Sequence, residues 1–190
     1  MKASKVFIVG IVGLPGSGKT TAAKYLESKG FTRVTLSDFI KEEVAKAGIT
    51  DYTREILQDY GNKMREQFGP QVLAQLALKK LKTDGVAKAV IDGIRNIHEV
   101  AALEIENNFH LVGIVAKPSI RYHRLLMNKG KAWVGSFEEF LQQEKREDSL
   151  GSQKFGLRVT DCLQKAKYFM HNNASREDFQ QSVDAMLKRL

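Results

Sequence analysis

The chain has 190 residues, of which 43% are hydrophobic and 27% are charged. This length is typical of about one domain, and the composition is ordinary for a globular protein. The one cysteine, Cys162, excludes an internal disulfide and fits a reducing cytoplasm, which is the localisation we expect. No apolar run approaches the ~20 residues of a membrane-spanning helix, so no membrane partner is predicted.

The formal net charge is +8 at pH 7. Lysines and arginines are scattered among acidic residues, as in KEEVAK at residues 41–46 and EKRED at residues 144–148. The sequence has no basic arm and no basic run with interleaved aromatic residues, which are signals of nucleic-acid binding. We therefore expect no specific nucleic-acid partner. The charge belongs either to a solvated surface or to arginines that converge on phosphates.

In chain order, short apolar runs alternate with longer helical patterns. The first run is apolar nearly throughout, as is typical of a central parallel strand covered on both faces. Strands are predicted at Val6–Val12, Thr32–Leu36, Ala87–Asp92, Leu111–Val115 and Tyr168–His171. Helices are predicted at Lys19–Ser28, Asp38–Ala47, Arg54–Phe68, Gln71–Leu81, Ile97–Glu104, Ile120–Met127, Ser136–Glu147, Arg158–Lys165 and Ser175–Leu190. This alternation predicts one α/β domain over residues 1–190, with a parallel sheet.

Two of the helix starts carry recognisable capping residues. Ser37-Asp38 offers N-cap chemistry to the second helix, and Ser136 with Glu139 fits a capping box. Two longer segments look inserted between strands, at residues 50–82 and 129–156. Each is a candidate mobile cap over a site at the strand ends.

The residues GLPGSGKT, at positions 13–20, match the Walker A pattern G-x-x-x-x-G-K-[ST]. A strand is predicted before this loop and a helix after it, which is the context that the motif requires. Glycines let consecutive backbone N–H groups turn toward a phosphate, and the helix adds its positive N-terminal end. Lys19 would reach the β- and γ-phosphates and the Thr20 hydroxyl would bind Mg²⁺. The predicted ligand is ATP with Mg²⁺, held by Gly13, Gly16, Ser17, Gly18, Lys19, Thr20 and Thr21.

The sequence AVIDG, at residues 89–93, is an apolar strand that ends in Asp92. A carboxylate in this place suits a Walker B role, in which it holds Mg²⁺ or its water shell. The alternative is a turn aspartate before a glycine. Three residues on, Arg95 lies just past the carboxyl end of the strand, where its planar fork can grip a phosphate with two hydrogen bonds.

Several stretches together resemble the nucleoside-monophosphate kinases: the Walker A loop, VTLSDFIK at residues 34–41, TRE at 53–55, DGIRN at 92–96 and NNAS at 172–175. The greatest similarity is to a branch of nucleotide-kinase-like proteins related to AMP and CMP kinases, and it runs nearly from end to end. It implies a three-layer P-loop fold with a five-stranded parallel sheet in the order 2-3-1-4-5. It also implies that the first insertion binds the acceptor and that the second is a lid.

The resemblance implies an acceptor site around Asp38 and Arg95. In adenylate kinases the second strand is followed by T-G-D-L-x-R, which corresponds here to LSDFIK. Asp38 matches, and Lys41 stands where the arginine binds the acceptor phosphate; lysine keeps the charge but loses the fork. The family's D-G-F-P-R resembles DGIR, which makes Arg95 the strongest acceptor-phosphate candidate. Arg54 and Arg65 lie on the acceptor-binding insertion, and the alternative for each is a surface helix arginine.

The resemblance also implies lid arginines that stabilise charge on the transferred phosphoryl group. Arg121 and Arg124 share one predicted helix, and Arg146 lies at the far end of the second insertion. The alternative for Arg146 is a solvated charged helix. Asn172 and Asn173 lie where such kinases hold the adenine ring.

We therefore predict an ATP-dependent phosphotransferase, monomeric or homodimeric, that moves the γ-phosphoryl group to a nucleoside or deoxynucleoside monophosphate. The predicted catalytic residues are Lys19, Asp38, Arg95, Arg124 and Arg146, with Thr20 and Asp92 at the metal. Dephospho-CoA kinase is an alternative, because Asp38 could act as a base toward a hydroxyl acceptor. That family has D-x-D-x-[IV] after strand two, and Leu36 replaces the first aspartate here. A non-catalytic nucleotide sensor or a slow ATPase is the remaining alternative.

Overall fold

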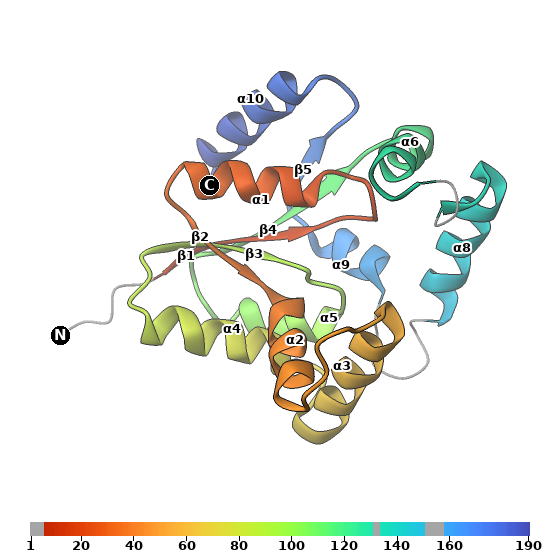
Figure 1. Ribbon diagram of the computed structural model, residues 1–190. Coiled ribbons are helices and arrows are strands. Elements are labelled where there is room, and N and C mark those ends of the chain that lie inside the picture. Colours follow the sequence, from red (N-terminus) through yellow and green to blue (C-terminus); the bar gives the residue numbers. More distant parts are fainter. Residues whose placement is uncertain (1–5, 131–133, 151–157) are drawn as a thin grey trace.

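Five short strands form one parallel sheet in the computed structural model of the protein (Figure 1). The structure describes residues 6–130, 134–150 and 158–190, without the side chains of residues 54, 55 and 146–150. The strands are β1 (Phe7–Val12), β2 (Thr32–Thr35), β3 (Lys88–Asp92), β4 (Phe109–Val115) and β5 (Tyr168–His171). They pair in parallel in the order β2-β3-β1-β4-β5, which confirms the predicted order.

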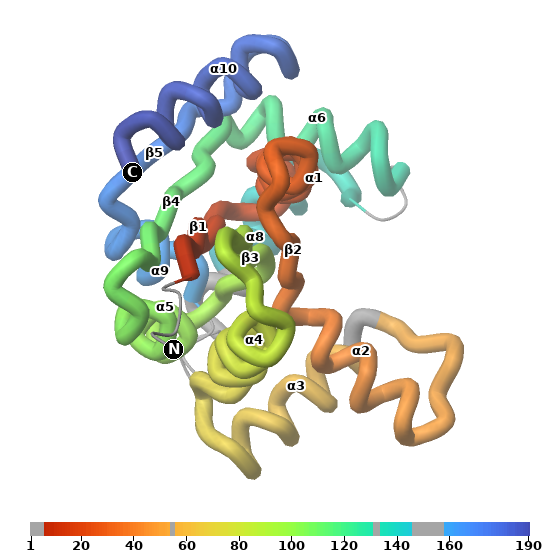
Figure 2. Tube along the Cα trace, turned by 90° about the vertical axis from the view of Figure 1, so that its left-hand side faces the viewer, coloured from red at the N-terminus to blue at the C-terminus, as the bar shows by residue number. Residues whose placement is uncertain are grey.

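Helices cover both faces of this sheet, so that the central strand β1 is buried on each side (Figures 1 and 2). One face carries α1 (Lys19–Ser28) and α10 (Arg176–Leu187), which pack on Val9 and Ile11 of β1. The other face carries α2 (Leu36–Lys46), α4 (Val72–Thr83), α5 (Ile97–Leu103) and α9 (Val159–Lys165), which pack on Ile8 and Val12. Alternate residues of a strand point to opposite faces, and this period builds the predicted three layers.

The remaining helices lie outside these two layers. The helix α3 (Arg54–Phe68) packs on α2, and α6 (Pro118–Lys129) packs against α8 (Phe137–Leu150). In Figure 1, α6 and α8 stand at the side of the sheet where the strands end. The helix α4 contributes five buried residues to the core, whereas α3 lies farther from the sheet. The segment predicted as an acceptor cap therefore consists of a core helix and an outer helix.

The second helix begins earlier than its capping residues predicted. The helix α2 starts at Leu36, its N-cap is Thr35, and no side chain caps it, so the predicted cap at Ser37-Asp38 is wrong. The reason is the apolar spacing: with the helix begun at Leu36, Leu36, Ile40 and Val44 all face the core and are buried. The predicted strand accordingly ends one residue earlier, at Thr35.

At two other helix starts, one capping box was predicted and one was not. The box of Ser136 and Glu139 is confirmed, because each backbone N–H donates to the other's side chain. A second box, Asn96 with Glu99 at the start of α5, was missed, although N-I-H-E has the spacing of such a box. This missed box leads to the most buried charged cluster that the structure describes.

Glu99 is a fully buried carboxylate that ties α3 and α5 to the loop after β3. Its oxygens accept hydrogen bonds from the backbone N–H of Arg95 at 2.8 Å and of Asn96 at 3.3 Å, and from Arg65 of α3 at 3.4 Å. The Asn96 amide also donates to the carbonyl of Pro70 at 3.1 Å. Burial raises the pKa of Glu99, against the opposite pull of Arg65 and the two backbone donors. The cluster therefore fixes the loop that carries Arg95.

Replacing Arg65 with methionine would leave the Glu99 carboxyl group without its cation. An acid whose folded pKa lies above its unfolded pKa loses stability as the pH rises through this interval, because only the charged form is penalised by burial. We expect Arg65→Met to lower the free energy of unfolding by about 3 kcal/mol at pH 8 and by less at pH 5. Urea unfolding at both pH values measures the difference from the wild type.

The control is the double variant Arg65→Met/Glu99→Gln, which has no ionisable group at this place. Its stability relative to Glu99→Gln alone should be the same at the two pH values. A deficit of Arg65→Met that does not change with pH would contradict the buried charge pair.

Candidate active site

The glycine loop joins the end of β1 to the start of α1, as its sequence predicts. Gly16 and Gly18 have φ angles of 76° and 105°, in the left-handed region that favours glycine. A Cβ on Gly16 would lie 2.6 Å from the carbonyl oxygen of Arg121, and one on Gly18 would collide with the Asn172 amide. The loop therefore needs glycine at these two positions for its backbone conformation and also for its close contacts with Arg121 and Asn172.

Asn172, predicted to contact the nucleotide base, braces this loop from the end of β5. It is 5% exposed, and its amide nitrogen donates to the carbonyl of Ser17 at 2.8 Å. Its amide oxygen accepts from Arg124 of α6 at 3.0 Å. The neighbouring Asn173 is exposed and accepts from the backbone N–H of Lys117 at 2.8 Å. Both asparagines thus hold the loops around the site, and their contact with a base stays a prediction.

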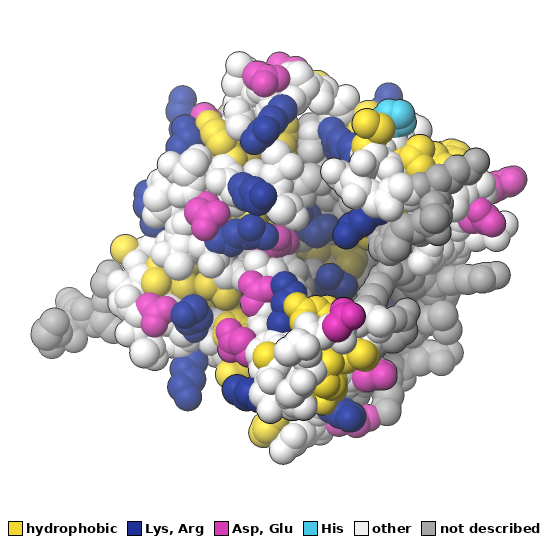
Figure 3. All heavy atoms as spheres, viewed as in Figure 1, with side chains coloured by type: hydrophobic (Ala, Val, Ile, Leu, Met, Phe, Trp, Pro, Cys, Tyr) yellow, Lys and Arg dark blue, Asp and Glu magenta, His cyan; other side chains and the backbone are white. Residues whose placement is uncertain are grey.

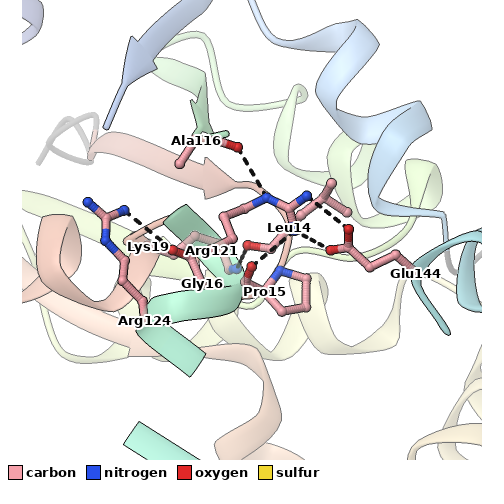
Figure 4. A network of polar contacts seen from close by, with 8 residues as sticks. All are labelled: Leu14, Pro15, Gly16, Lys19, Ala116, Arg121, Arg124 and Glu144. Carbon is pink, nitrogen blue, oxygen red and sulfur yellow. Dashed lines mark hydrogen bonds and ion pairs between the residues drawn. The ribbon is translucent and has the colours of Figure 1, made fainter. Parts of the chain in front are cut away.

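Lys19 of the loop lies in a mostly desolvated position between charged neighbours. Its ammonium group donates to the carbonyl of Leu14 at 3.1 Å, which folds the side chain back over the loop (Figure 4). Its pKa is lowered to about 8, chiefly by burial; the charge of Asp92 raises the pKa, and the charges of Arg95 and Arg121 lower it. Three charged residues, from the end of β3, the loop after it and α6, therefore act on Lys19 at this edge of the sheet.

Asp92, at the end of β3, is 6% exposed and forms an ion pair with Arg33 of β2 at 3.3 Å. Arg33 was not among the predicted site residues. The signal was the register: Asp92 lies opposite Thr35, so that Arg33, two residues before Thr35, points to the same face. The second strand was predicted to end at Leu36, so the sequence did not show that Thr35 lies opposite Asp92.

Arg121 joins the glycine loop to α8 (Figure 4). It is 4% exposed, and it donates to the carbonyls of Ala116 at 3.1 Å and Pro15 at 3.3 Å. Its two terminal nitrogens both bind the carboxylate of Glu144 on α8, one of them at 2.9 Å. The helix of the predicted lid is thus connected to the phosphate loop by a guanidinium. Arg124, one turn on, points to Gly16 and Asn172.

The predicted acceptor residues occupy different surroundings. Asp38 and Lys41 form an ion pair at 2.6 Å on the exposed side of α2. The Arg95 side chain is exposed, whereas that of Arg65 is buried against Glu99. The contact of Arg65 with an acceptor stays a prediction. The side chain of Arg54, at the start of α3, lies outside the described residues.

The predicted lid is described only in part. The side chain of Arg146 on α8, and residues 131–133 and 151–157 around it, lie outside the described residues. Its catalytic role therefore stays a prediction.

An open hollow of about 400 Å³ lies beside the ion pair of Arg33 and Asp92. Its lining residues are Glu27, Arg33, Thr35, Asp38 and Lys41, from α1, β2 and α2. In Figure 3, side chains of both charges gather over the centre of this face, between α1 above and α2 below. Within the described residues, the site thus offers a phosphate loop on one side and a polar hollow on the other.

Comparison with known families identifies the chain. A family model described as AAA domain matches residues 9–147. The chain is 34% identical to a UPF0200 protein of Pyrobaculum aerophilum over 96% of this chain and 98% of the relative. A UPF0200 protein of Hyperthermus butylicus is 30% identical over 100% of this chain and 98% of the relative. The chain belongs to the UPF0200 family. The region that matches these relatives includes the phosphate loop, the residues that line the hollow and the described part of the predicted lid.

Solved structures share the fold of this UPF0200 chain. Dephospho-CoA kinase from Campylobacter jejuni has a TM-score of 0.56 at 16% identity, over 96% of each chain. Shikimate kinase from Acinetobacter baumannii has a TM-score of 0.53 at 18% identity, over 98% of this chain and 96% of the other. TT1252 from Thermus thermophilus has a TM-score of 0.64 at 21% identity, over 97% and 98%. The resemblance to P-loop kinases is thereby confirmed at the level of the fold.

The UPF0200 chain shows no described helix that combines the length and the apolar composition needed to cross a bilayer.

The lowered pKa of Lys19 predicts a pH-dependent affinity for nucleotide. In the free protein the ammonium group is half deprotonated near pH 8, and bound phosphates would restore its charge. We expect the Kd of Mg·ADP to rise by up to about tenfold per pH unit above pH 8, where phosphate is fully ionised. Isothermal titration calorimetry at pH 7, 8 and 9 measures this.

Lys19→Arg is the matched control, because a guanidinium stays charged across this range. Its affinity is expected to be weaker but nearly independent of pH. Parallel pH profiles for the wild type and Lys19→Arg would show that Lys19 is not the titrating group.

Proposed function

We propose that the protein is an ATP-dependent phosphotransferase that moves the γ-phosphoryl group of ATP·Mg²⁺ to a nucleoside monophosphate. One observation carries this proposal: the loop lysine Lys19 lies within electrostatic reach of both Asp92 and Arg95. A carboxylate at the end of a strand can hold the metal ion of the phosphate donor. An arginine beside the phosphate loop can bind the anionic acceptor.

Thr20 and Asp92 are suited to hold the magnesium ion. Hydroxyl and carboxylate oxygens are ligands that Mg²⁺ prefers, and Asp92 is fixed in place by burial and by Arg33. Thr20 lies in the first turn of α1, next to Lys19. A magnesium ion bound here would neutralise phosphate charge and orient the phosphates.

The residues of the chain itself then hold the two substrates and the developing charge. The N–H groups of Gly13–Thr21 would hold the donor phosphates, with the Lys19 ammonium at the β- and γ-phosphates. Arg124, and Arg146 at the far end of the lid, would stabilise charge on the equatorial oxygens of the phosphoryl group. The connection of α8 to the loop through Arg121 would bring the lid over the site and exclude water.

Arg95 would bind the acceptor phosphate. The hydrogen bond from its backbone N–H to Glu99 holds its loop, while its side chain remains exposed and acts on Lys19. Asp38, Lys41 and Arg54 lie on the two helices after β2, where they would contact the rest of the acceptor. A monophosphate is already anionic, so the positive charges of Lys41, Arg54 and Arg95 serve it better than a general base would.

Phosphorylation of dephospho-CoA is the second candidate. The observation that favours it is the Asp38 carboxylate, which is exposed and lines the hollow, where it could accept a proton from a hydroxyl. The dephospho-CoA kinase from Campylobacter jejuni shares the fold. This carboxylate is already engaged in an ion pair with Lys41 at 2.6 Å.

An ADP-release assay with a panel of acceptors tests the proposal. The panel contains AMP, CMP, UMP, GMP, their deoxy forms, dephospho-CoA and shikimate, each with saturating ATP and Mg²⁺. We expect one or more monophosphates to increase turnover over ATP alone. Stimulation by dephospho-CoA alone would favour the second candidate, and ATP turnover that no acceptor increases would identify an ATPase or a nucleotide-binding protein.

Arg95→Ala should weaken use of the acceptor and spare the donor. Loss of a charge-assisted contact to phosphate predicts a fall of about 10- to 100-fold in kcat/KM for the acceptor. The Kd of Mg·ADP should change by less than about twofold, since the donor is held by the loop. The exposed Arg189, near the end of the chain, gives the control Arg189→Ala, and equal kinetics for both variants would remove Arg95 from the acceptor site.

A further inference from the structure

Arg33 is a charged residue at the site that the proposed function has not used. It lies on the edge strand β2, and its side chain shares a face with Thr35 and Asp92. One terminal nitrogen donates to the Asp92 carboxylate at 3.3 Å, and the side chain is 22% exposed. The same side chain lines the hollow. Its guanidinium therefore lies between the proposed metal carboxylate and the hollow.

The guanidinium of Arg33 has donors to spare. A guanidinium carries five N–H donors, and the contact with Asp92 uses one of them at a distance slightly beyond the usual range. Its Nε is buried and has no hydrogen-bond partner within the part of the chain that the structure describes. The side chain as a whole is 22% exposed, so an anion that entered the hollow would meet the donors that Asp92 does not occupy.

The other lining residues indicate what kind of molecule the hollow fits. Arg33 and Lys41 supply positive charge for an anionic group. Glu27 and Asp38 supply carboxylate oxygens, which accept hydrogen bonds from hydroxyl groups, and Thr35 can both donate and accept. A phosphate monoester of a sugar or nucleoside combines these features, because its phosphate meets the cations and its hydroxyls meet the carboxylates.

The position of the hollow relative to the donor loop suits a second substrate. Asp92 contacts Arg33 on one side and acts on Lys19 on the other. An anion bound by Arg33 would thus share the Asp92 carboxylate as a neighbour with the Lys19 ammonium of the donor loop. Phosphoryl transfer requires the two substrates to lie next to each other.

We propose that Arg33 binds the phosphate of the acceptor in this hollow and supplies the two-pronged grip that Lys41 does not. The inference rests on the proposed function for the identity of the ligand as an acceptor. Lys41 stands where related kinases carry an arginine, and its ammonium group is engaged by Asp38 at 2.6 Å. Arg33 reaches the same hollow from the neighbouring strand with the fork geometry that a lysine lacks.

The test is a binding experiment that needs no turnover. The full chain is saturated with Mg²⁺ and a non-hydrolysable ATP analogue, which fills the donor site up to the γ-phosphate. Inorganic phosphate, AMP and CMP are then titrated separately by calorimetry into the wild type, Arg33→Gln and Arg33→Lys. We expect saturable binding to the wild type and a Kd raised by about 10- to 100-fold in Arg33→Gln.

Arg33→Lys separates the fork from the charge. It keeps a cation and should bind inorganic phosphate more weakly than the wild type but more tightly than Arg33→Gln. Arg189→Gln, at an exposed arginine near the end of the chain, is the matched control and should bind as the wild type does. The melting temperature of each variant is measured first, and if Arg33→Gln does not fold, Arg33→Lys carries the comparison.

A second measurement distinguishes substrate binding from positioning of Asp92. The Mg²⁺ concentration needed for half-maximal binding of the ATP analogue is compared between the wild type and Arg33→Gln. If this concentration rises while the Kd of phosphate and of the monophosphates is unchanged, Arg33 only orients Asp92 and the proposal is overturned. Absence of any phosphate or monophosphate binding to the wild type would also overturn it.

The outcomes for Arg33 and for the proposed function can be told apart. Phosphate binding that depends on Arg33, in a protein that turns over no acceptor, supports the anion site and contradicts the kinase activity. Turnover of a monophosphate with the same acceptor KM in Arg33→Gln and the wild type supports the kinase activity and contradicts the role of Arg33.

Discussion

All five strands end at the same edge of the sheet, because every strand pair is parallel. This constraint brings together side chains that the sequence keeps far apart. The glycine loop follows β1, the Asp38–Lys41 pair follows β2, and Asp92 and Arg95 stand at the end of β3. Asn172 follows β5 on the opposite side of the loop. The common direction of the strands therefore determines which residues meet at the site, and the residues themselves determine its chemistry.

Within that edge, buried polar contacts decide which groups are held and which stay available. Glu99 fixes the backbone at Arg95 but leaves its side chain exposed. Arg121 is fully engaged by carbonyls and by Glu144, and it connects α8 to the glycine loop. Arg33 keeps unused donors, and burial lowers the pKa of Lys19 to about 8. The guanidinium of Arg121 is thus held in several contacts, whereas that of Arg33 has donors left for a ligand.

The sequence predicted the strand order through family resemblance, and the Walker A motif with its flanking strand and helix located the phosphate loop. Local patterns were less informative where tertiary packing decides. Leu36 was assigned to the end of the second strand, but it is the first residue of a helix whose buried face also contains Ile40 and Val44. Arg33 could not be found, because its importance arises from the register of β2 against β3. The partner of Arg65 is 34 residues away in sequence, so it looked like a surface arginine.

The hydrogen bond between Asn172 and the glycine loop has a consequence for folding during synthesis. The two residues that it joins, Ser17 and Asn172, are 155 positions apart. The ribosome adds Asn172 155 residues after Ser17, and contacts of such long range form late in folding because a large loop must first close. We expect the glycine loop of a nascent chain to be synthesised well before it can hold a nucleotide.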